Sequence, residues 1–237
     1  MTNLINLGDL LVVSPMIALL VMSLIPVLMK VFSDNNEPKP FVTVVYALMG
    51  VILAIGLTAS LTGVKQTAFS ESLIFDGMAI WGSLIVLFSG AFALMLAFDH
   101  VETDAKQFSE QCFLMLGSMI GMLIVILSND LIVTFLGIEM MSLCLYILVA
   151  MSREEVLSKE ASFKYFVLGS FASAIFLYGI ALLYGTVGGT SLPVVAAKTG
   201  ELLANHNQLF YLGMAMVVLG FAFKVSVFPF HSWTPDV

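Results

Sequence analysis

The chain has 237 residues, of which 60 % are hydrophobic and only 11 % are charged, and its mean hydropathy is +1.05. A soluble domain is about 45–50 % apolar and about 25 % charged, so this composition excludes an ordinary soluble core. The formal net charge of −7 says little about partners, because most acidic residues lie between the apolar blocks. Both cysteines, Cys112 and Cys144, fall inside apolar blocks, which favours neither a disulfide framework nor a metal site.

Long apolar blocks account for most of the sequence. They span residues 10–29, 41–63, 77–98, 111–128, 131–151, 165–187 and 208–223. Most reach the roughly 20 residues that a helix needs to cross a bilayer; block 111–128 is at the short end. The last block is long enough to cross the bilayer only if its helix continues past Lys224. None shows the period-two alternation of membrane strands. We therefore predict an all-α fold, a polytopic bundle of about seven transmembrane helices.

The flanks of the blocks indicate how the chain is inserted. The segment before the first block, MTNLINLGD, lacks Lys and Arg, and the block is longer than the apolar core of a cleaved signal peptide. By the positive-inside rule, the side with more Lys and Arg faces the cytoplasm. The N-terminal side carries Lys65 and Lys198, and the other side carries Lys30, Lys39, Lys106, Arg153, Lys159 and Lys164. We therefore place the N-terminus on the non-cytoplasmic side.

The connections are too short for a catalytic domain. Little more than Asn129 and Asp130 separates the fourth and fifth blocks, which predicts a tight antiparallel hairpin. The longest connection, about 188–207, has room for a short surface segment. The sequence has no GxGxxG, Walker, CxxC or HExxH motif, so we expect no metal or nucleotide site, and any chemistry takes place within the membrane.

Glu139 is a charge in the middle of the fifth block. An ionised side chain at bilayer depth costs about 2.5–3.5 kcal/mol on insertion scales, and such residues are typically functional. On a helix that advances 100° per residue, Ser142 and Tyr146 fall within about 60° of Glu139. This polar stripe must face protein or water. A structural carboxyl that holds a bundle together is the alternative to a proton carrier.

Lys224 is the second such charge, on a different predicted helix. Burial favours the neutral form of an amine, and a nearby carboxylate favours its charged form, so a Glu–Lys pair can act as a switch. The alternative is a lysine that extends to the lipid headgroups. Several apolar residues separate Lys224 from the next polar residue, His231, which argues against that alternative.

The segment KVSVFPFHSWTPDV interrupts the last predicted helix. Pro229 and Pro235 each lack a backbone donor, so we predict a break near Pro229. Broken helices at membrane depth typically line a cavity or a site. His231 beside the break can relay protons, because its unperturbed pKa is near 6.5. Alternatively, the helix ends at the interface, with Trp233 as an interfacial aromatic residue.

Lys164 is a weaker candidate for proton transfer. It follows Glu160 by four residues at the start of the sixth block, so an interfacial ion pair explains it equally well. Gly169 and Ser173 on the same block are small residues typical of close helix packing.

Three strings resemble one family: FLGIEMMSLCLYILVA, EASFKYFVLGSFASAIFLYGIALLYG and GFAFKVSVFPFHSWTPDV. They look like successive helices of the antiporter-like membrane subunits of respiratory complex I, the NADH:quinone oxidoreductase. The resemblance runs from about residue 110 to the end of the chain, and EASFKY and FPFHSWTPDV separate it from sister branches and from cation/proton antiporters. Residues 1–109 match only in helix count and in a DGMAIW-like start to one helix.

This resemblance implies a fold of fourteen helices with two inverted repeats, each with a broken helix. Residues 1–109 would be the first three helices, and 110–237 an incomplete first repeat. Glu139 matches the family's helix 5 glutamate, Lys224 its helix 7 lysine, Lys164 a helix 6 lysine and His231 a histidine of the central polar axis. The helix 8 lysine and the second repeat are absent, and from the ending TPDV we expect a fragment of a longer protein.

The resemblance implies a proton-translocating subunit in a bacterial inner membrane, packed against other membrane subunits of the complex and the lipid bilayer. It implies that this chain binds no cofactor, NADH or nucleic acid. NADH, FMN, iron–sulfur clusters and quinone would be bound by other subunits. A monovalent cation/proton antiporter of the same superfamily is one alternative, and a structural scaffold whose buried charges only pair is another.

Overall fold

A computed structural model describes residues 6–32, 38–63, 65–101, 107–151 and 156–236. Eight helices lie within this part of the chain: α1 Leu7–Phe32, α2 Pro40–Ser60, α3 Gly77–Asp99, α4 Phe108–Leu127, α5 Leu131–Val149, α6 Val156–Val187, α7 Leu192–Ala204 and α8 Gln208–Lys224. The first six are long and apolar enough to cross a membrane. The chain is therefore a multi-pass membrane protein, and the predicted helical bundle is confirmed.

The seventh predicted helix, α8, is shorter than expected. It has 17 residues, and turns follow it as far as Asp236. The helix ends five residues before Pro229, because Val227 N donates to Ala222 O at 2.9 Å and Ser226 adopts a left-handed conformation with φ 54°. Such a left-handed cap satisfies the last carbonyls of a helix. The regular helix therefore does not continue past Lys224, and the break lies earlier than the proline pattern predicts.

Two elements occupy the connections. An antiparallel hairpin, β1 Gln66–Ala68 and β2 Leu73–Phe75, joins α2 to α3. Its three-residue strands are too short to span a membrane. Helix α7 is the short segment expected between residues 188 and 207.

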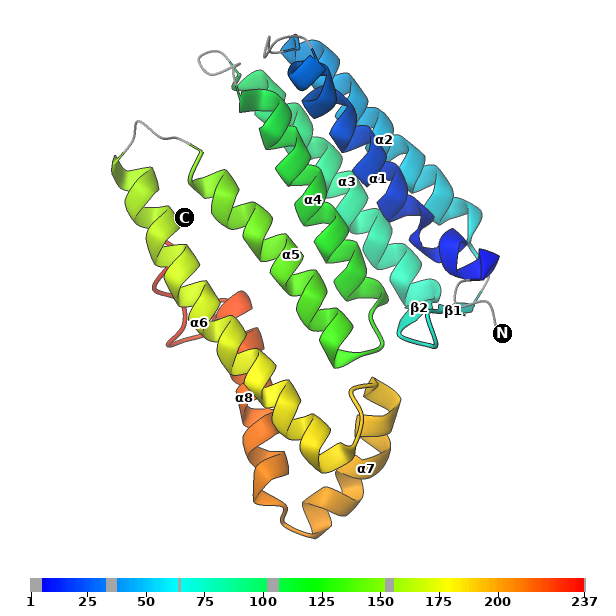
Figure 1. Ribbon diagram of the computed structural model, residues 1–237, viewed down its shortest axis with the longest axis vertical. Coiled ribbons are helices and arrows are strands. Elements are labelled where there is room, and N and C mark those ends of the chain that lie inside the picture. The colour runs from blue at the N-terminus through cyan, green and yellow to red at the C-terminus, as the bar shows by residue number, and fades with distance from the viewer. Residues whose placement is uncertain (1–5, 33–37, 64, 102–106, 152–155, 237) are drawn as a thin grey trace.

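The connections separate into two ends of the bundle. The C-terminal ends of α1, α3 and α5 lie at one end, and the hairpin, the α4–α5 turn and α7 lie at the other (Figure 1). The N-terminal end of α1 is at the hairpin end, where Asp9 Oδ1 accepts a hydrogen bond from Phe69 N at 2.9 Å. Of the six cations predicted at the end opposite the hairpin, Lys106 and Arg153 lie outside the described residues.

The α4–α5 turn connects its neighbours through backbone hydrogen bonds. Asn129 N donates to Ser72 O in the hairpin loop at 2.9 Å, and Leu192 N at the start of α7 donates to Asn129 O at 2.9 Å. The predicted tight turn is confirmed. It also joins segments from both halves of the chain, which fixes where α5 begins.

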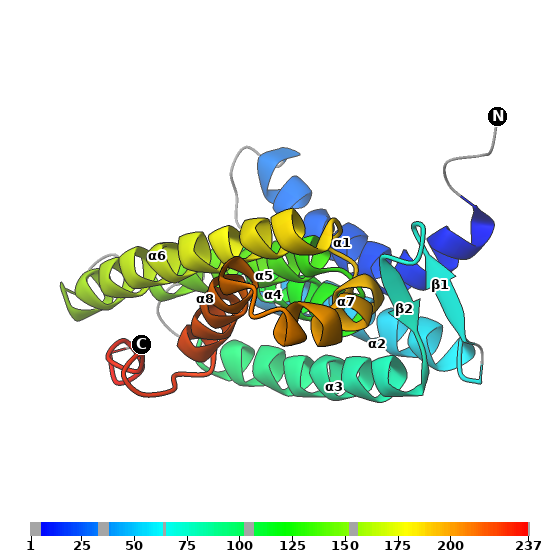
Figure 2. The same cartoon turned by 90° about the horizontal axis from the view of Figure 1, so that it is seen from below.

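Glycines permit the close packing of two helix pairs. A Cβ at Gly121 of α4 would lie 2.6 Å from Met141 N of α5, and a Cβ at Gly179 of α6 would lie 2.8 Å from Val217 N of α8. Helix α8 therefore lies directly against α6 (Figure 2). One buried apolar cluster is formed by α1 to α4 with the hairpin, and a second by α5 to α8.

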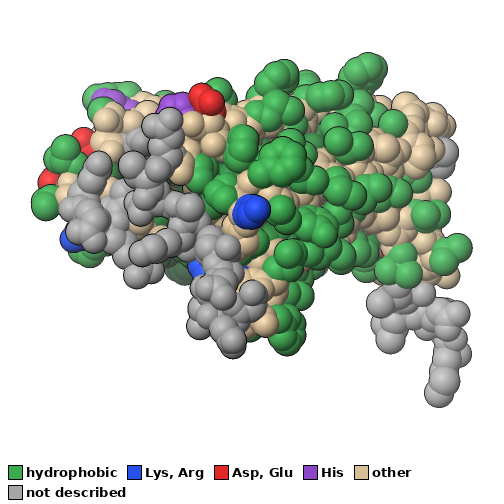
Figure 3. Space-filling model, turned by 90° about the horizontal axis from the view of Figure 1, so that it is seen from above, with side chains coloured by type: hydrophobic (Ala, Val, Ile, Leu, Met, Phe, Trp, Pro, Cys, Tyr) green, Lys and Arg blue, Asp and Glu red, His purple; other side chains and the backbone are tan. Residues whose placement is uncertain are grey.

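The outer surface is apolar. Hydrophobic side chains are widespread on the face in Figure 3, and the few charged ones lie mainly toward its left side. Large side chains such as Trp81 and Phe171 are about two-thirds exposed, at 70 % and 69 %. Such exposure suits a protein whose outer surface contacts lipid rather than water.

Candidate functional site

Helix α5 presents the polar stripe that its sequence predicts. The helix begins at Leu131 because Asp130 Oδ1 accepts hydrogen bonds from Ile132 N at 2.8 Å and Val133 N at 3.4 Å. From this start, Glu139, Ser142 and Tyr146 lie on one face. Ser142 is fully buried and Tyr146 is 6 % exposed, so the stripe faces protein rather than lipid.

Glu139 contacts α6 through a serine. The Ser173 hydroxyl donates to Glu139 Oε1, and Ser173 is buried. The sequence prediction assigned Ser173 only to helix packing and missed this contact. The available signal was its position four residues after Gly169, which places a small residue and a hydroxyl on one face of α6.

Lys224, the last residue of α8, reaches the same stripe of α5. Its Nζ donates to Ser142 Oγ at 2.7 Å and lies 3.5 Å from the Tyr146 hydroxyl. The amine is also 5.8 Å from the centroid of the Tyr146 ring and 5.6 Å from that of Phe223, within the range of cation–π attraction. Lys224 therefore points into the bundle rather than extending to the headgroups.

Glu139 and Lys224 do not form a direct ion pair. Within the described ranges, ion pairs join Lys30 to Glu110, and Lys164 to both Glu160 and Asp236. Glu139 and Lys224 are instead each bound to a serine hydroxyl. The site thus brings an acid of α5 and a base of α8 to one stripe of α5 without pairing them directly.

An aromatic cluster closes the site at the α8 end. The Tyr165 ring makes an edge contact with Tyr146 and a stacked contact with Trp233, both with centroids 4.6 Å apart. Trp233 also lies 5.4 Å from Phe223. The segment after α8 therefore folds back onto α6, and Trp233 packs against aromatic rings of α6 and α8.

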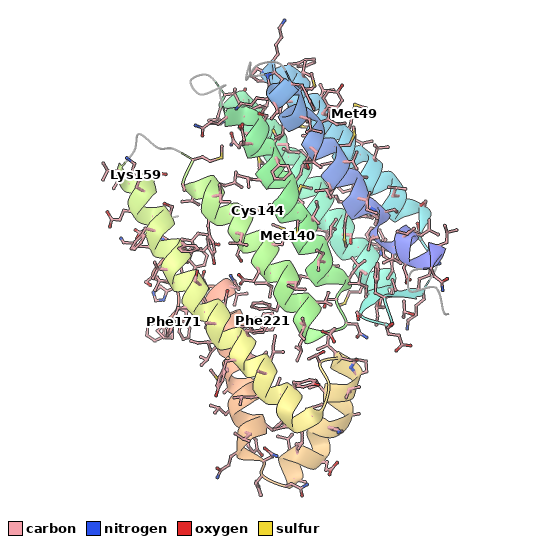
Figure 4. The ribbon with its side chains drawn as sticks, in the orientation of Figure 1. Met49, Met140, Cys144, Lys159, Phe171 and Phe221 are labelled. Carbon is pink, nitrogen blue, oxygen red and sulfur yellow. The ribbon has the colours of Figure 1, made fainter. Side chains whose placement is uncertain are left out.

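Tyr146 occupies a notch in α6. A Cβ built at Gly169 would lie only 1.9 Å from the Tyr146 hydroxyl oxygen, so only glycine leaves room for the tyrosine at this height. Tyr146 also borders a hollow of about 460 Å³ between α5 and α6 that Lys159, Ser162 and Phe166 help to line. Lys159 lies near the start of α6 (Figure 4).

The other two predicted site residues lie outside this contact network. Lys164 pairs with Glu160 at 2.7 Å, as its spacing predicts, and also with Asp236 at 2.9 Å; its side chain is 44 % exposed. His231 lies after the break, exposed, with its ring 5.6 Å from that of Phe228. Neither has a hydrogen bond or ion pair with Glu139 or Lys224 among the described residues.

The remaining reactive side chains near α5 are structural. Cys144 lies on the face of α5 that packs against α4, where a Cβ at Gly117 would be 2.9 Å from its sulfur (Figure 4). Among the described residues, no group of three His, Cys, Asp or Glu side chains is placed to hold a metal ion.

Comparison with known proteins gives consistent results. Residues 128–237 match the family described as the transmembrane part of NADH:quinone oxidoreductase and Mrp antiporters. The chain is 48 % identical over 98 % of its length to "NADH-quinone oxidoreductase subunit N" of Bdellovibrio bacteriovorus, and 36 % identical over 97 % to the protein of that name from Paramagnetospirillum magneticum. It covers 48 % and 47 % of these proteins, so it spans about half the length of the curated relatives it matches.

Solved structures show the same fold. A chain of respiratory complex I from Thermus thermophilus superposes with a TM-score of 0.76 at 28 % identity, over 94 % of this chain and 46 % of that one. A chain of the Mrp complex from a Dietzia species gives a TM-score of 0.72 at 18 % identity, over 96 % of this chain and 43 % of that one. The second likeness shows the fold alone.

Proposed function

Because the chain is homologous, over nearly its whole length, to about half of the NADH-quinone oxidoreductase subunit N proteins, we propose that it translocates protons as a membrane subunit of a respiratory complex I. The observation that carries the proposal is the position of Lys224. From α8 its amine reaches the α5 stripe that also carries Glu139, and the two form no ion pair. Ionisable groups in such positions mark proton pathways.

The geometry supports a pairing switch. A lysine close to a carboxylate favours its charged form, and a lysine without that partner in an apolar site favours its neutral form. Movement of Glu139 and Lys224 together would load a proton on the lysine, and their separation would release it. The described geometry corresponds to the separated arrangement, since each group is bound to a serine.

The rest of the assignment is part of the same proposal. Electron transfer from NADH through FMN and iron–sulfur clusters to quinone would take place in other subunits, which would drive the pairing switch through the membrane domain. The chain itself would do no redox chemistry and would act as part of a translocase in a bacterial inner membrane. Lys164 and His231 would carry protons to or from the pair, since both lie on the segments that border it.

Substitution of the pair tests the proposal. We expect Glu139→Gln and Lys224→Ala, made in the assembled complex, to lower NADH-driven proton pumping by at least about tenfold, because each removes one charge of the switch. Pumping is measured as acidification of inverted membrane vesicles, per amount of assembled complex. Undiminished pumping in both variants would contradict the proposal.

Matched controls distinguish the pair from other charges. Glu110→Gln alters a carboxylate that pairs with Lys30 at the other side of the bundle, and Lys198→Ala removes an exposed lysine that donates to Val187 O. Both controls should keep pumping near the wild-type level.

The two alternatives give different results. A cation/proton antiporter, which the family description also includes, would exchange ions without NADH and would not copurify with redox subunits. A structural scaffold would show reduced assembly in Glu139→Gln and Lys224→Ala but normal pumping by the complexes that do assemble.

A further inference from the structure

The tightest contact of Lys224 is with a serine that is completely buried. Its Nζ lies 2.7 Å from Ser142 Oγ, whereas the Tyr146 hydroxyl is at 3.5 Å. A hydrogen bond from an amine to an oxygen has a typical length of about 2.7–3.2 Å, so the first contact is a close one and the second lies outside this range. Ser142 is therefore the main polar partner of the amine in this arrangement.

The backbone of α5 fixes the direction of this hydrogen bond. Ser142 Oγ donates to Ile138 O at 2.6 Å. A serine hydroxyl has a single hydrogen, so once it is donated to the backbone the oxygen can only accept. Towards Lys224, Ser142 is therefore an acceptor, which suits the N–H groups of a lysine.

Ser142 and Glu139 offer the lysine two alternative positions. They lie three residues apart on one face of α5, a rise of about 4.5 Å along the axis. Glu139 is meanwhile bound to Ser173 on α6. Glu139 and Lys224 thus each have a neutral hydroxyl as hydrogen-bond partner, so neither needs the other for its hydrogen bond.

We propose that Ser142 is a positioning residue that holds Lys224 away from Glu139 and so stabilises the separated arrangement of the pair. The inference rests on the proposed function and adds to it a residue with no charge and no proton to carry. Without the Ser142 hydroxyl, the lysine would lose its neutral partner and move to Glu139, where it stays charged to higher pH.

The pH profile of pumping tests this role. We expect Ser142→Ala, in the assembled complex, to lower NADH-driven pumping about tenfold near neutral pH and to move the alkaline limb of the profile up by about one pH unit, because a lysine that rests beside Glu139 keeps its charge to higher pH. Ser142→Thr keeps the hydroxyl and the bond to Ile138 O, so its profile should lie closer to the wild type.

Ser23→Ala is the matched control. Ser23 is also buried and also donates to a carbonyl of its own helix, Leu20 O at 2.7 Å, but it has no charged partner in the part of the chain that the structure describes. Its profile should match the wild type. Ser142→Ala behaving like Ser23→Ala, or Ser142→Thr shifting the limb as far as Ser142→Ala does, overturns the inference. If Ser142→Ala does not assemble, Ser142→Cys replaces it under the same two criteria.

The outcome is separable from that of the main proposal. If Glu139→Gln and Lys224→Ala both keep full pumping, the proposed function fails. If they lose pumping while Ser142→Ala keeps the wild-type profile, only the role of Ser142 fails. A serine with a purely structural role would change the amount of assembled complex without moving the alkaline limb.

Discussion

At the scale of single residues, the site depends on Gly169, because a glycine has no Cβ. The hydroxyl of Tyr146 fills the space that a Cβ at Gly169 would occupy. The Tyr146 ring also makes edge contacts with the rings of Tyr165 and Phe166, which restrict its rotation. The position of the tyrosine beside Lys224 is therefore set by α6 rather than by its own helix.

Substitution of this glycine should disturb the site directly. We expect Gly169→Ala to displace Tyr146 and destabilise the bundle by about 1–3 kcal/mol, the usual cost of overpacking, and to reduce pumping. Thermal unfolding in detergent and vesicle acidification measure the two effects. Gly185→Ala on the same helix is the control, because a Cβ there meets nothing within 4 Å. Adding Tyr146→Phe should restore part of the lost stability, and no difference between Gly169→Ala and Gly185→Ala would contradict this account.

The sequence predicts one side of this site and not the other. The stripe of Glu139, Ser142 and Tyr146 follows from helical periodicity, which is local. The contact of Ser173 with Glu139 depends on which face of α6 meets α5, and the stacking of Trp233 depends on how the chain folds back after α8. Both are tertiary contacts between segments far apart in sequence, and periodicity places Ser173 on one face of α6 without showing which helix that face meets.

At the scale of the elements, the start of α5 determines the height of Glu139 in the bundle. Asp130 accepts from two backbone N–H groups of the first turn, and its other oxygen accepts from the Thr190 hydroxyl at 2.6 Å. The cap thus holds α5 to the connection that follows α6. The sequence pattern places Asp130 only in a tight turn and predicts neither its capping role nor its partner sixty residues away.

Removal of the Asp130 cap of α5 should lower the stability of the protein more than removal of the Asp76 cap of α3. We expect Asp130→Ala to lower stability by about 0.5–2 kcal/mol for the lost cap and by a further contribution for the lost contact with Thr190. Asp76 caps α3 through a single hydrogen bond to Ala79 N, at 2.9 Å. Asp130→Ala should therefore lower the unfolding temperature of the purified protein more than Asp76→Ala. Equal shifts would show that the Thr190 contact contributes nothing.

The ends of the helices are harder to predict from the sequence than their long apolar central parts. Six apolar blocks become six long helices because their length and composition decide the outcome. The end of α8 differs, since Ser226 adopts a left-handed conformation that no proline or glycine signals. The hairpin is also absent from the prediction, because strands of three residues are too short to show a period.

At the scale of the whole molecule, the two ends of the bundle differ in construction. The hairpin end is joined by hydrogen bonds that run from α1 to the hairpin, and from the hairpin through the α4–α5 turn to α7. Among the described residues, the other end has the ion pair of Lys30 with Glu110, at 2.6 Å, and those of Lys164. The site lies on the three helices α5, α6 and α8, so a movement of α6 and α8 against α5 would change the distance between its two charges.

The orientation of the bundle can be tested at its two ends. By the positive-inside rule we propose that the hairpin end faces away from the cytoplasm. Lys65 precedes the hairpin and Lys39 precedes α2 at the opposite end, and both are exposed. In intact cells, a membrane-impermeant maleimide should label Lys65→Cys and spare Lys39→Cys, and in inverted vesicles the pattern should reverse. Background labelling should be low, because Cys112 is 2 % exposed and Cys144 packs against Gly117. Labelling of Lys39→Cys in intact cells would mean that the bundle is inserted the other way.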